Sequence, residues 1–389
     1  MTFIWATILT LGLLIFIHEL GHYLASRSVG VRVERFSIGI PPRFISMISE
    51  DNGWLFRIYF YKWIDGRLNW SPIVEKIINR PGKIGSNTEY VLALIPIGGY
   101  VKMAGIIDES MDTNISYEPD ELMSKPLWAK LWVMSAGVIM NIVLAFFLFS
   151  VIGYAQGMPE LLNEPIVAEL QEDKPAQHAG IQPGDRIILI NGSSIKTWDD
   201  LTSTIHALPN TEISLTILRE KVEIDMIMTT TTMIIPSETG IDTLGAIGII
   251  PEFIYKKITI GESLSIGLIR TVSSFGLIFL SLKMLGSGAA SMADFGGPIM
   301  IAQLAGQTAQ AGWIPFFSFM ALISVNLAFI NILPIPGLDG GHILIHLIEA
   351  VIRRPMTIKA RIIIQQIGMA FLLLIMITVV YNDIIRLLN

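Results

Sequence analysis

Two histidines and a glutamate near the start of the chain have the types and the spacing of a metal site that could activate water. His18, Glu19 and His22 form the pattern His-Glu-x-x-His. On a helix, side chains four residues apart share one face, so both imidazoles can bind one metal ion with the carboxylate beside them. Zinc held in this way lowers the pKa of a water molecule, and the glutamate takes the proton. The pattern predicts a zinc hydrolase with Glu19 as general base.

The setting of this pattern is a membrane helix. The residues before it, from Phe3 to Ile17, are almost purely apolar, and a helix over about residues 3–24 is long enough to cross a bilayer. Ionisable side chains inside such a segment are costly, so they mark functional sites. A chance occurrence of the pattern is therefore less favoured here than it would be in a soluble helix.

Composition agrees with an integral membrane protein. Of the 389 residues, 52% are hydrophobic and 15% are charged, whereas soluble domains carry about 25% charged residues. The net charge is -6 without a basic patch, which argues against a nucleic-acid partner. There are no cysteines, so thiolate ligands and disulfides are excluded, and zinc must be held by His, Asp or Glu.

Three further apolar runs predict membrane helices, which gives four crossings in an α-helical polytopic protein. Arginines and lysines follow the first helix and precede the last one, which places these ends in the cytoplasm by the positive-inside rule. We expect a multi-pass membrane protein whose zinc site lies near the cytoplasmic side. The three runs are about residues 130–154, 315–333 and 362–388.

Residues 31–103 have the alternation and the turn residues of short strands and hairpins. They complete the first half of the enzyme core, residues 1–155. An exposed strand edge near Gly98 and Gly99 could pair with an extended substrate. The alternative is a structural sheet that covers the cytoplasmic face. Within this region, residues 51–86 form a polar and aromatic insertion to which the sequence assigns no role.

Residues 160–252 predict one inserted, β-rich soluble domain. The segments Ala179-Gly180-Ile181, Pro183-Gly184-Asp185 and Asn191-Gly192 occur in the order typical of the PDZ domains of bacterial proteases, which the chain resembles here. PDZ domains bind peptides or protein C-termini by strand addition. Because the domain follows the second membrane helix, we expect it in the periplasm, with His178 and His206 as ordinary surface histidines.

A catalytic zinc needs a third protein ligand. Asp339 follows the third predicted membrane helix, about residues 315–333, where prolines and glycines break the helix, and lies at the depth expected for the histidines. On the residues alone His342, His346, Glu34 and Glu349 remain alternatives. The second half of the enzyme core, residues 312–389, carries Asp339.

One zinc ion also constrains the topology of residues 253–311, which we interpret as a linker with an amphipathic helix. If residues 264–285 crossed the bilayer, the next helix would carry Asp339 to the face opposite His18. A single metal cannot be bound from both faces, so this helix is expected to lie in the membrane interface. In the second membrane helix, Asn141 is expected to face protein, either in a hydrogen bond to the first helix or as a lining of the site.

Four features together resemble the site-2 protease family of intramembrane zinc metalloproteases, and within it the bacterial group of regulator of sigma-E proteases (RseP). They are His-Glu-Leu-Gly-His in the first helix, Pro96 to Met103, the PDZ-like segment, and the sequence Asn331-Ile-Leu-Pro-Ile-Pro-Gly-Leu-Asp-Gly-Gly. The resemblance implies that His18, His22 and Asp339 bind zinc and that Glu19 is the base. It also implies that Asn331 and Pro334 lie beside the substrate strand and that the protein lies in the bacterial inner (cytoplasmic) membrane.

The resemblance further implies single-pass membrane substrates, such as anti-sigma factors or signal-peptide remnants, cut after a site-1 protease has removed their outer domain. The chain departs from the best-known members in having one PDZ-like segment instead of two and in the insertion at residues 51–86. The competing function is a non-catalytic one, either a membrane scaffold or a metal transporter. A scaffold would not need Glu19, and transport would favour polar residues spread over several helices.

Overall fold

The chain forms two compact units. The computed structural model describes residues 2–64, 67–106, 116–237, 240–288 and 296–388, which include all but residues 289–295 of the predicted linker. The helical unit comprises Met1–Ala155 and Thr259–Asn389, and the β-rich unit comprises Gln156–Ile258. Each unit has its own apolar core.

Five helices of the helical unit are long and apolar enough to cross a membrane. One of them, α5, contains the segment that the sequence places in the interface, so the count of four crossings stays a prediction. Two shorter helices, α6 (Pro298–Ala311) and α8 (Asp339–Ile352), and a 3-10 turn, η1 (Leu122–Ser124), complete the helical structure described. The five long helices are α1 (Thr2–Ser28), α2 (Leu127–Gln156), α5 (Ile260–Gly286), α7 (Trp313–Ile332) and α9 (Ile358–Leu388).

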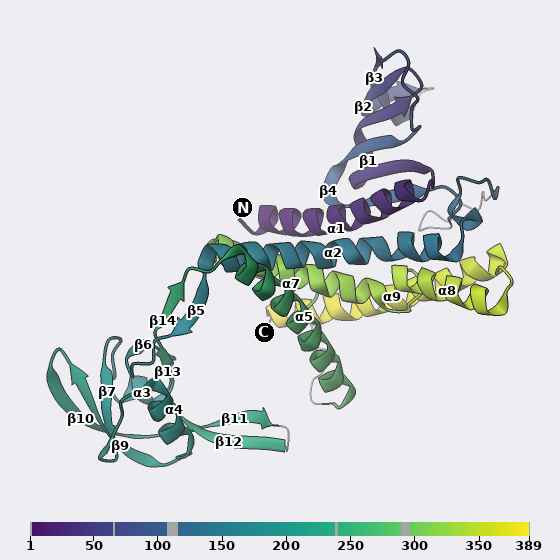
Figure 1. Cartoon of the computed structure of the whole chain (residues 1–389). Coiled ribbons are helices and arrows are strands. Elements are labelled where there is room, and N and C mark those ends of the chain that lie inside the picture. The colour runs from purple at the N-terminus through teal and green to yellow at the C-terminus, as the bar shows by residue number, and fades with distance from the viewer. Residues whose placement is uncertain (1, 65–66, 107–115, 238–239, 289–295, 389) are drawn as a thin grey trace. The chain divides into compact units, whose positions relative to one another are not determined.

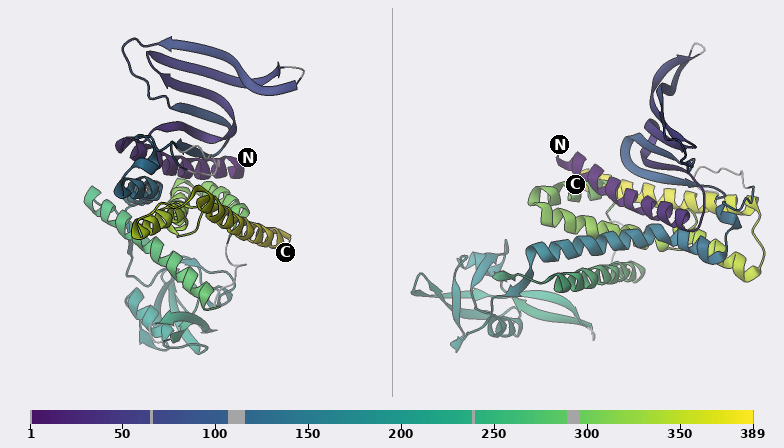
Figure 2. Two further views of the ribbon diagram at one scale, coloured as in Figure 1. Left: turned by 90° about the vertical axis from the view of Figure 1, so that its right-hand side faces the viewer. Right: turned by 45° about the horizontal axis from the view of Figure 1, so that its top comes forward.

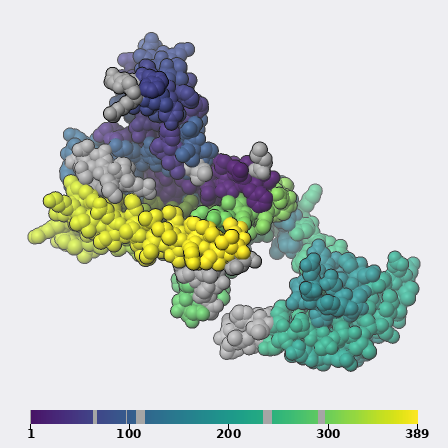
Figure 3. Space-filling view, turned by 180° about the vertical axis from the view of Figure 1, so that it is seen from behind, coloured from purple at the N-terminus to yellow at the C-terminus, as the bar shows by residue number. Residues whose placement is uncertain are grey.

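Small and aromatic side chains hold the long helices together. Ala6 of α1, Ala145 of α2 and Ala321 of α7 are fully buried and belong to one cluster with Phe316 and Met320. Small residues let helix backbones approach closely, which is how helices associate where lipid supplies no hydrophobic drive. Figure 1 shows α1 and α2 side by side, and Figure 3 shows α8 and α9, in yellow, along one face of this unit.

Several chain segments meet at one end of this helix bundle. The rings of Trp5 and Phe316, at the starts of α1 and α7, lie 5.7 Å apart. Asp383, near the end of α9, is 2% exposed and accepts hydrogen bonds from the backbone N–H groups of Gly297, Ile299 and Met300. A carboxylate here satisfies donors that the first turn of α6 would otherwise leave unpaired. The starts of α1, α6 and α7 therefore lie with the end of α9.

A four-stranded sheet joins α1 to α2, in the order β3-β2-β1-β4 (Figure 2). Its strands are longer than the sequence predicts. The insertion at residues 51–86 contains β2, which pairs with β1, and β3, which pairs with β2, so both continue the sheet instead of forming a separate element. Phe36 of β1 pairs with both Val101 and Tyr90, so the first half of β1 contacts both halves of β4. The strands are β1 (Val33–Glu50), β2 (Gly53–Ile64), β3 (Arg67–Asn79) and β4 (Glu89–Met103).

The β-rich unit is built around a sheet of order β10-β9-β7-β8. Its core is aliphatic and includes Ile187, Ile190, Leu215 and Ile217, each at most 1% exposed. Three antiparallel pairs, β11–β12, β13–β6 and β14–β5, complete it. The elements are β5 (Met158–Leu161), β6 (Val167–Leu170), α3 (Pro175–His178), β7 (Arg186–Ile190), β8 (Ser193–Ser194), α4 (Trp198–His206), β9 (Glu212–Arg219), β10 (Val222–Thr229), β11 (Thr231–Ser237), β12 (Gly240–Ala246), β13 (Ile249–Pro251) and β14 (Phe253–Lys256).

An ion pair with a buried carboxylate joins the residue before β7 to the end of β9. The Asp185 side chain is 1% exposed, and the Arg219 guanidinium donates to both of its oxygens, at 2.7 Å to Oδ1 and 2.6 Å to Oδ2. Burial alone would raise the pKa of Asp185, but the hydrogen bonds from Arg219 and from the N–H of Gln182 lower it. The carboxylate is therefore held ionised at neutral pH.

Candidate metal centre

Three of the predicted ligands meet at one point. His18 Nε2 lies 3.2 Å from His22 Nε2, and Asp339 Oδ2 lies 3.1 Å from the first and 3.3 Å from the second. Zinc bonds of about 2.0–2.1 Å in a tetrahedron put neighbouring ligand atoms about 3.3 Å apart. Asp339 Oδ2 is buried without a hydrogen-bond partner among the described residues, as a ligand atom directed at a metal would be. The three groups fit zinc with one position left for water.

Local structure places each of these groups. His18 and His22 lie four residues apart on α1, and Asp339 is the first residue of α8, where the helix dipole favours a carboxylate. Behind it, a Cβ on Gly340 or Gly341 would collide with backbone carbonyls of residues 332–335. The loop can fold back on the start of α8 only because these two residues are glycines.

The charge state of Asp339 suits a metal ligand. Burial would raise the pKa of this carboxyl group, but the electrostatic attraction of the two nearby imidazoles lowers it. The group is therefore a carboxylate at neutral pH, the form in which a metal binds it.

The far nitrogens of both imidazoles have partners on α2. His22 Nδ1 lies 2.8 Å from the carbonyl oxygen of Val133 and donates to it, which leaves Nε2 for the metal. His18 Nδ1 lies 3.3 Å from the side-chain amide of Asn141, and Asn141 Oδ1 is buried without a partner among the described residues. With zinc on Nε2, His18 Nδ1 carries a hydrogen, so the oxygen of the amide is the atom that must face it.

The sequence left two alternatives for Asn141, and its contact with His18 is the first of them, a hydrogen bond to α1. It is fully buried behind the His18 ring, the position of a residue that orients a ligand. Ser324 on α7 donates to the backbone carbonyl of Asn141 at 2.8 Å and so fixes this turn of α2. A direct contact between Asn141 and substrate stays a prediction.

Gly137 is a site residue that sequence reasoning missed. A Cβ at this position of α2 would lie 2.5 Å from His22 Nε2, 2.6 Å from His18 Cε1 and 2.7 Å from His18 Nε2. Only glycine lets α2 pass this close to the ligand atoms. The signal in the sequence was its spacing, since Gly137 lies four residues before Asn141 and so on the same helix face.

The predicted general base, Glu19, lies beside the sheet. Glu19 follows His18 on α1 and is half-buried, and its Cγ lies 3.8 Å from where a Cβ on Gly99 would be. Gly98, at φ +89°, adopts a backbone conformation that favours glycine, and its Cβ position lies near Ile15 and Ile40. Gly98 and Gly99 therefore bring β4, an edge strand of the sheet, next to the base.

The alternative third ligands lie elsewhere. His342 Nε2 is 3.4 Å from the amide of Gln365, and Glu34 pairs with Lys102 at 3.1 Å. His346 and Glu349 contact each other at 3.4 Å. The group of potential ligands found among the described residues contains Asp339 and neither His342 nor His346.

Asn331 and Pro334 stand on the segment that leads to Asp339. Asn331 is in the last turn of α7 and is half-buried, and Pro334 is exposed in the loop after it. Both therefore lie close to the ligand in sequence, and their contact with substrate stays a prediction.

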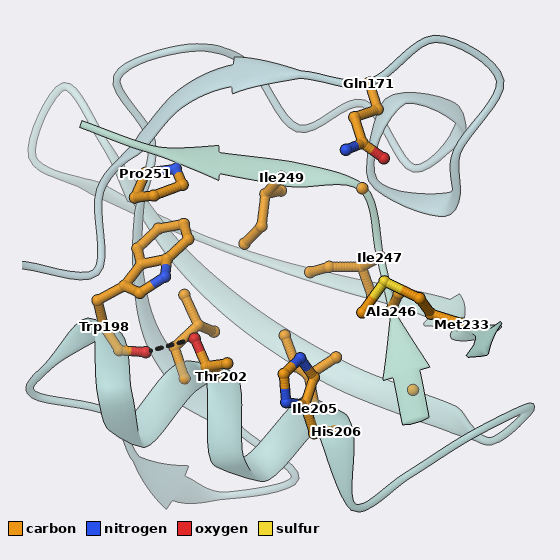
Figure 4. Close-up of a pocket in the computed structure, with 13 residues that line it drawn as sticks. Gln171, Trp198, Thr202, Ile205, His206, Met233, Ala246, Ile247, Ile249 and Pro251 are labelled. Carbon is orange, nitrogen blue, oxygen red and sulfur yellow. Dashed lines mark hydrogen bonds between the residues drawn. The ribbon is translucent and has the colours of Figure 1, made fainter. Parts of the chain in front are cut away.

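The β-rich unit has a cavity of about 280 Å³ between α4 and the chain from β12 to β13. Figure 4 shows Trp198 and Ile205 of α4 on one side and Ile247 and Ile249 on the other. His206 also lines this cavity and is half-buried, so the expectation of an ordinary surface histidine stays a prediction for it. Ile205, the residue before it on α4, is buried in the core of the unit, so the His206 ring lies at the cavity. His178 is exposed as expected.

Two histidines and a carboxylate that converge inside a bundle of apolar helices, with a glutamate beside them, define a membrane-embedded metalloprotease. The model of peptidase family M50 matches residues 6–63 and 75–375. The chain belongs to this family, as its resemblance to the site-2 proteases predicted, and it is a zinc metalloprotease.

Relatives align over nearly the whole chain. A protein of Clostridium acetobutylicum whose name places it with the zinc metalloproteases is 33% identical over 98% of this chain and 97% of its own. The regulator of sigma-W protease RasP of Bacillus subtilis is 28% identical over 98% of each chain. Among solved structures, the PDZ domain of an SdrC-like protein from Listeria monocytogenes aligns at 18% identity over 24% of this chain and 93% of its own, with a TM-score of 0.19.

Proposed function

We propose that this protease cuts peptide bonds within the membrane segments of single-pass proteins. The observation that carries the proposal is the convergence of His18, His22 and Asp339 beside Glu19 on a helix that is apolar enough to span a bilayer. Anti-sigma factors and signal-peptide-type proteins are the substrates proposed, after a site-1 protease has removed the outer domain. The relative named as a regulator of sigma-W supports a signalling substrate.

The chain's own groups supply the proton transfers. Zinc bound by the three ligands would lower the pKa of water and polarise the scissile carbonyl. Glu19 accepts the proton of the attacking water and returns it to the leaving nitrogen. Val133 and Asn141 hold the imidazoles in the orientation that leaves their Nε2 atoms free.

Substrate presentation is proposed at the edge of the sheet. A helical substrate hides its carbonyls in its own hydrogen bonds, so cleavage needs local unwinding. The Gly99–Met103 half of β4 pairs with β1 on one side, and an unwound segment pairing on the other would recover the lost bonds. We expect Leu-to-Gly changes in the substrate helix to speed cleavage, and an unchanged rate across such a series would refute this step.

The proposed topology keeps four crossings, with both ends of α5 on the outer side. The start of α5 packs against the end of α2, where the Cβ of a residue at 153 would lie 3.4 Å from Ile266. The next helix, α6, begins beside Asp383 at the same end of the bundle. Only 11 residues, 287–297, connect α5 to α6, too few for a returning helix, and irregular backbone does not cross lipid.

The absence of cysteines makes this topology directly measurable. Single cysteines at Thr259 and Ser287 flank α5, and a cysteine at Thr357 precedes α9. In intact cells, an impermeant maleimide should label the first two and not the third. Labelling of Thr259→Cys without Ser287→Cys would show that α5 crosses the membrane and would refute the four-helix topology.

We propose that the β-rich unit is a PDZ-type module in the periplasm that takes the C-terminus of a peptide or protein into the cavity beside α4. Strand β13 pairs with β6 on one side only, and apolar side chains such as Trp198 and Ile249 line the cavity. This is the arrangement of strand addition, in which backbone pairing gives affinity and the pocket gives specificity.

The site of cleavage tests the proposed function. The purified protease is reconstituted in vesicles with a single-pass substrate that lacks its outer domain, and the products are mapped by mass spectrometry. We expect a cut inside the apolar segment, and no product from Asp339→Asn. A cut confined to the flanking polar residues, or the same cut from the Asp339→Asn variant, would refute it.

A further inference from the structure

A second polar site lies at the far end of α8 from Asp339. A cavity of about 260 Å³ is lined by Lys130 of α2 and by Arg353 and Arg354, which follow α8. His346 and Glu349 of α8 also line it. These are neither zinc ligands nor neighbours of Glu19 in the sequence, so the proteolytic reaction does not account for them.

The cavity is strongly cationic. Its one lining carboxylate, Glu349, is already neutralised, since Arg361 donates to it at 2.5 Å and the N–H of Met356 at 2.7 Å. No ion pair to Arg353 or Arg354 is found in the part of the chain that the structure describes. Three cationic side chains therefore face one small space whose only carboxylate is neutralised by Arg361.

His346 is a second and independent pointer to a ligand. It is 2% exposed, and its Nε2 is buried without a hydrogen-bond partner among the described residues. Its Nδ1 lies 3.4 Å from Glu349 Oε2 and donates to it. Burial, together with the nearby charges of Arg361 and Lys130, lowers the pKa of His346 to about 4, so the ring is neutral and Nε2 presents a lone pair. A buried acceptor without a partner costs free energy, so a ligand that donates a hydrogen bond to Nε2 would be stabilised here.

The surroundings fit the headgroup layer of a membrane. Trp128 and Trp132, in the first turns of α2, are 65% and 43% exposed, and tryptophans gather at membrane interfaces. A basic pocket between membrane helices is a form in which proteins bind anionic headgroups.

We propose that this cavity binds the headgroup of an anionic phospholipid, with the phosphate at Lys130, Arg353 and Arg354 and a headgroup hydroxyl donating to His346. Phosphatidylglycerol carries both groups. Phosphatidylcholine has no donor and adds a positive charge. With the topology proposed above, this lipid lies in the cytoplasmic leaflet; the binding itself does not depend on that topology.

The test measures lipid binding to the full-length protein in detergent, by its thermal unfolding as a function of lipid. Phosphatidylglycerol, phosphatidylmethanol and phosphatidylcholine are compared, because phosphatidylmethanol keeps the phosphate charge and lacks the hydroxyl. We expect binding to weaken in that order. For Lys130→Gln/Arg354→Gln we expect the affinity for phosphatidylglycerol to fall about 25-fold, at roughly fivefold for each cation near the membrane surface.

Two further variants separate the site from general charge effects. Lys76→Gln/Lys83→Gln removes two exposed cations from β3 and the loop after it and should bind like the wild type. His346→Phe should abolish the preference for phosphatidylglycerol over phosphatidylmethanol and retain binding of both. Unfolding without lipid shows that each variant is folded.

Several results would overturn the proposal. These are equal stabilisation by all three lipids, equal losses in the two double variants, or an unchanged preference in His346→Phe. Stabilisation by glycerol 3-phosphate with none by the lipids would assign the cavity to a soluble phosphate and refute the headgroup. Cleavage is not measured, so failure here leaves the proposed function untouched.

Discussion

Replacement of Gly137 by alanine should greatly weaken zinc binding without unfolding the protein. The added methyl carbon would lie 2.5 Å from His22 Nε2 and 2.7 Å from His18 Nε2, whereas unstrained heavy-atom contacts lie at about 3.5 Å. One or both imidazoles must therefore move by nearly 1 Å, and zinc sites tolerate about 0.2 Å. We expect the affinity for zinc to fall at least about 100-fold, since a misplacement of this size costs that much in a preorganised site.

The measurement is zinc affinity by chelator competition on purified protein, with thermal unfolding of the metal-free form as the check on folding. Gly153→Ala is the matched control on the same helix, because its Cβ would meet Ile266 at an ordinary 3.4 Å. It should bind zinc like the wild type. If Gly137→Ala binds zinc as tightly as Gly153→Ala, the close approach of α2 to the ligand atoms is wrong.

Two further predictions concern residues that support the site and the β-rich unit. Asn141→Leu should weaken zinc binding about 10–100-fold, the usual effect of losing a partner of a metal-bound histidine. The affinity is measured by chelator competition, and an unchanged affinity would show that Asn141 does not orient His18. Arg219→Ala should leave the Asp185 carboxylate without its guanidinium partner and destabilise the β-rich unit, measured as faster amide exchange in β7 and β9. Because the folded-state pKa of Asp185 is lowered, the stability due to this pair is present above the unfolded-state pKa and is lost as the pH falls through the folded-state pKa. If the exchange rates of the wild type and of Arg219→Ala differ by the same factor at pH 7 and at pH 2, this pH dependence of the ion pair is wrong.

The sequence predicted the enzyme class, the zinc cofactor and the family, and the family match and the relatives' names confirm them. The local part of the site was readable because His18 and His22 are set four residues apart by helix geometry alone. Asp339 required knowing which face of the membrane its helix reaches, and on the residues alone His342 remained open. The fold favours Asp339, because Asp339 lies with His18 and His22, whereas His342 Nε2 lies 3.4 Å from the amide of Gln365.

What could not be read from sequence depends on contacts between distant elements. Gly137 matters only because α2 passes directly over the imidazoles, and glycines are frequent in membrane helices whether or not they face a site. The length of β1 follows from its pairing with the β2–β3 hairpin, which a pattern read one strand at a time does not reveal. The number of crossings is a property of the bilayer and the chain together, so the α5 helix alone does not determine it.

The most direct test of the account measures bound zinc and cleavage together in the wild type and in Glu19→Gln, with a single-pass substrate that lacks its outer domain. The account predicts about one zinc per chain in both proteins, because Glu19 is not a ligand. It also predicts a loss of about 10²–10⁴-fold in the rate of cleavage for the variant, the contribution of a general base. Cleavage by Glu19→Gln at the wild-type rate, or a wild type that cleaves without bound zinc, would contradict it.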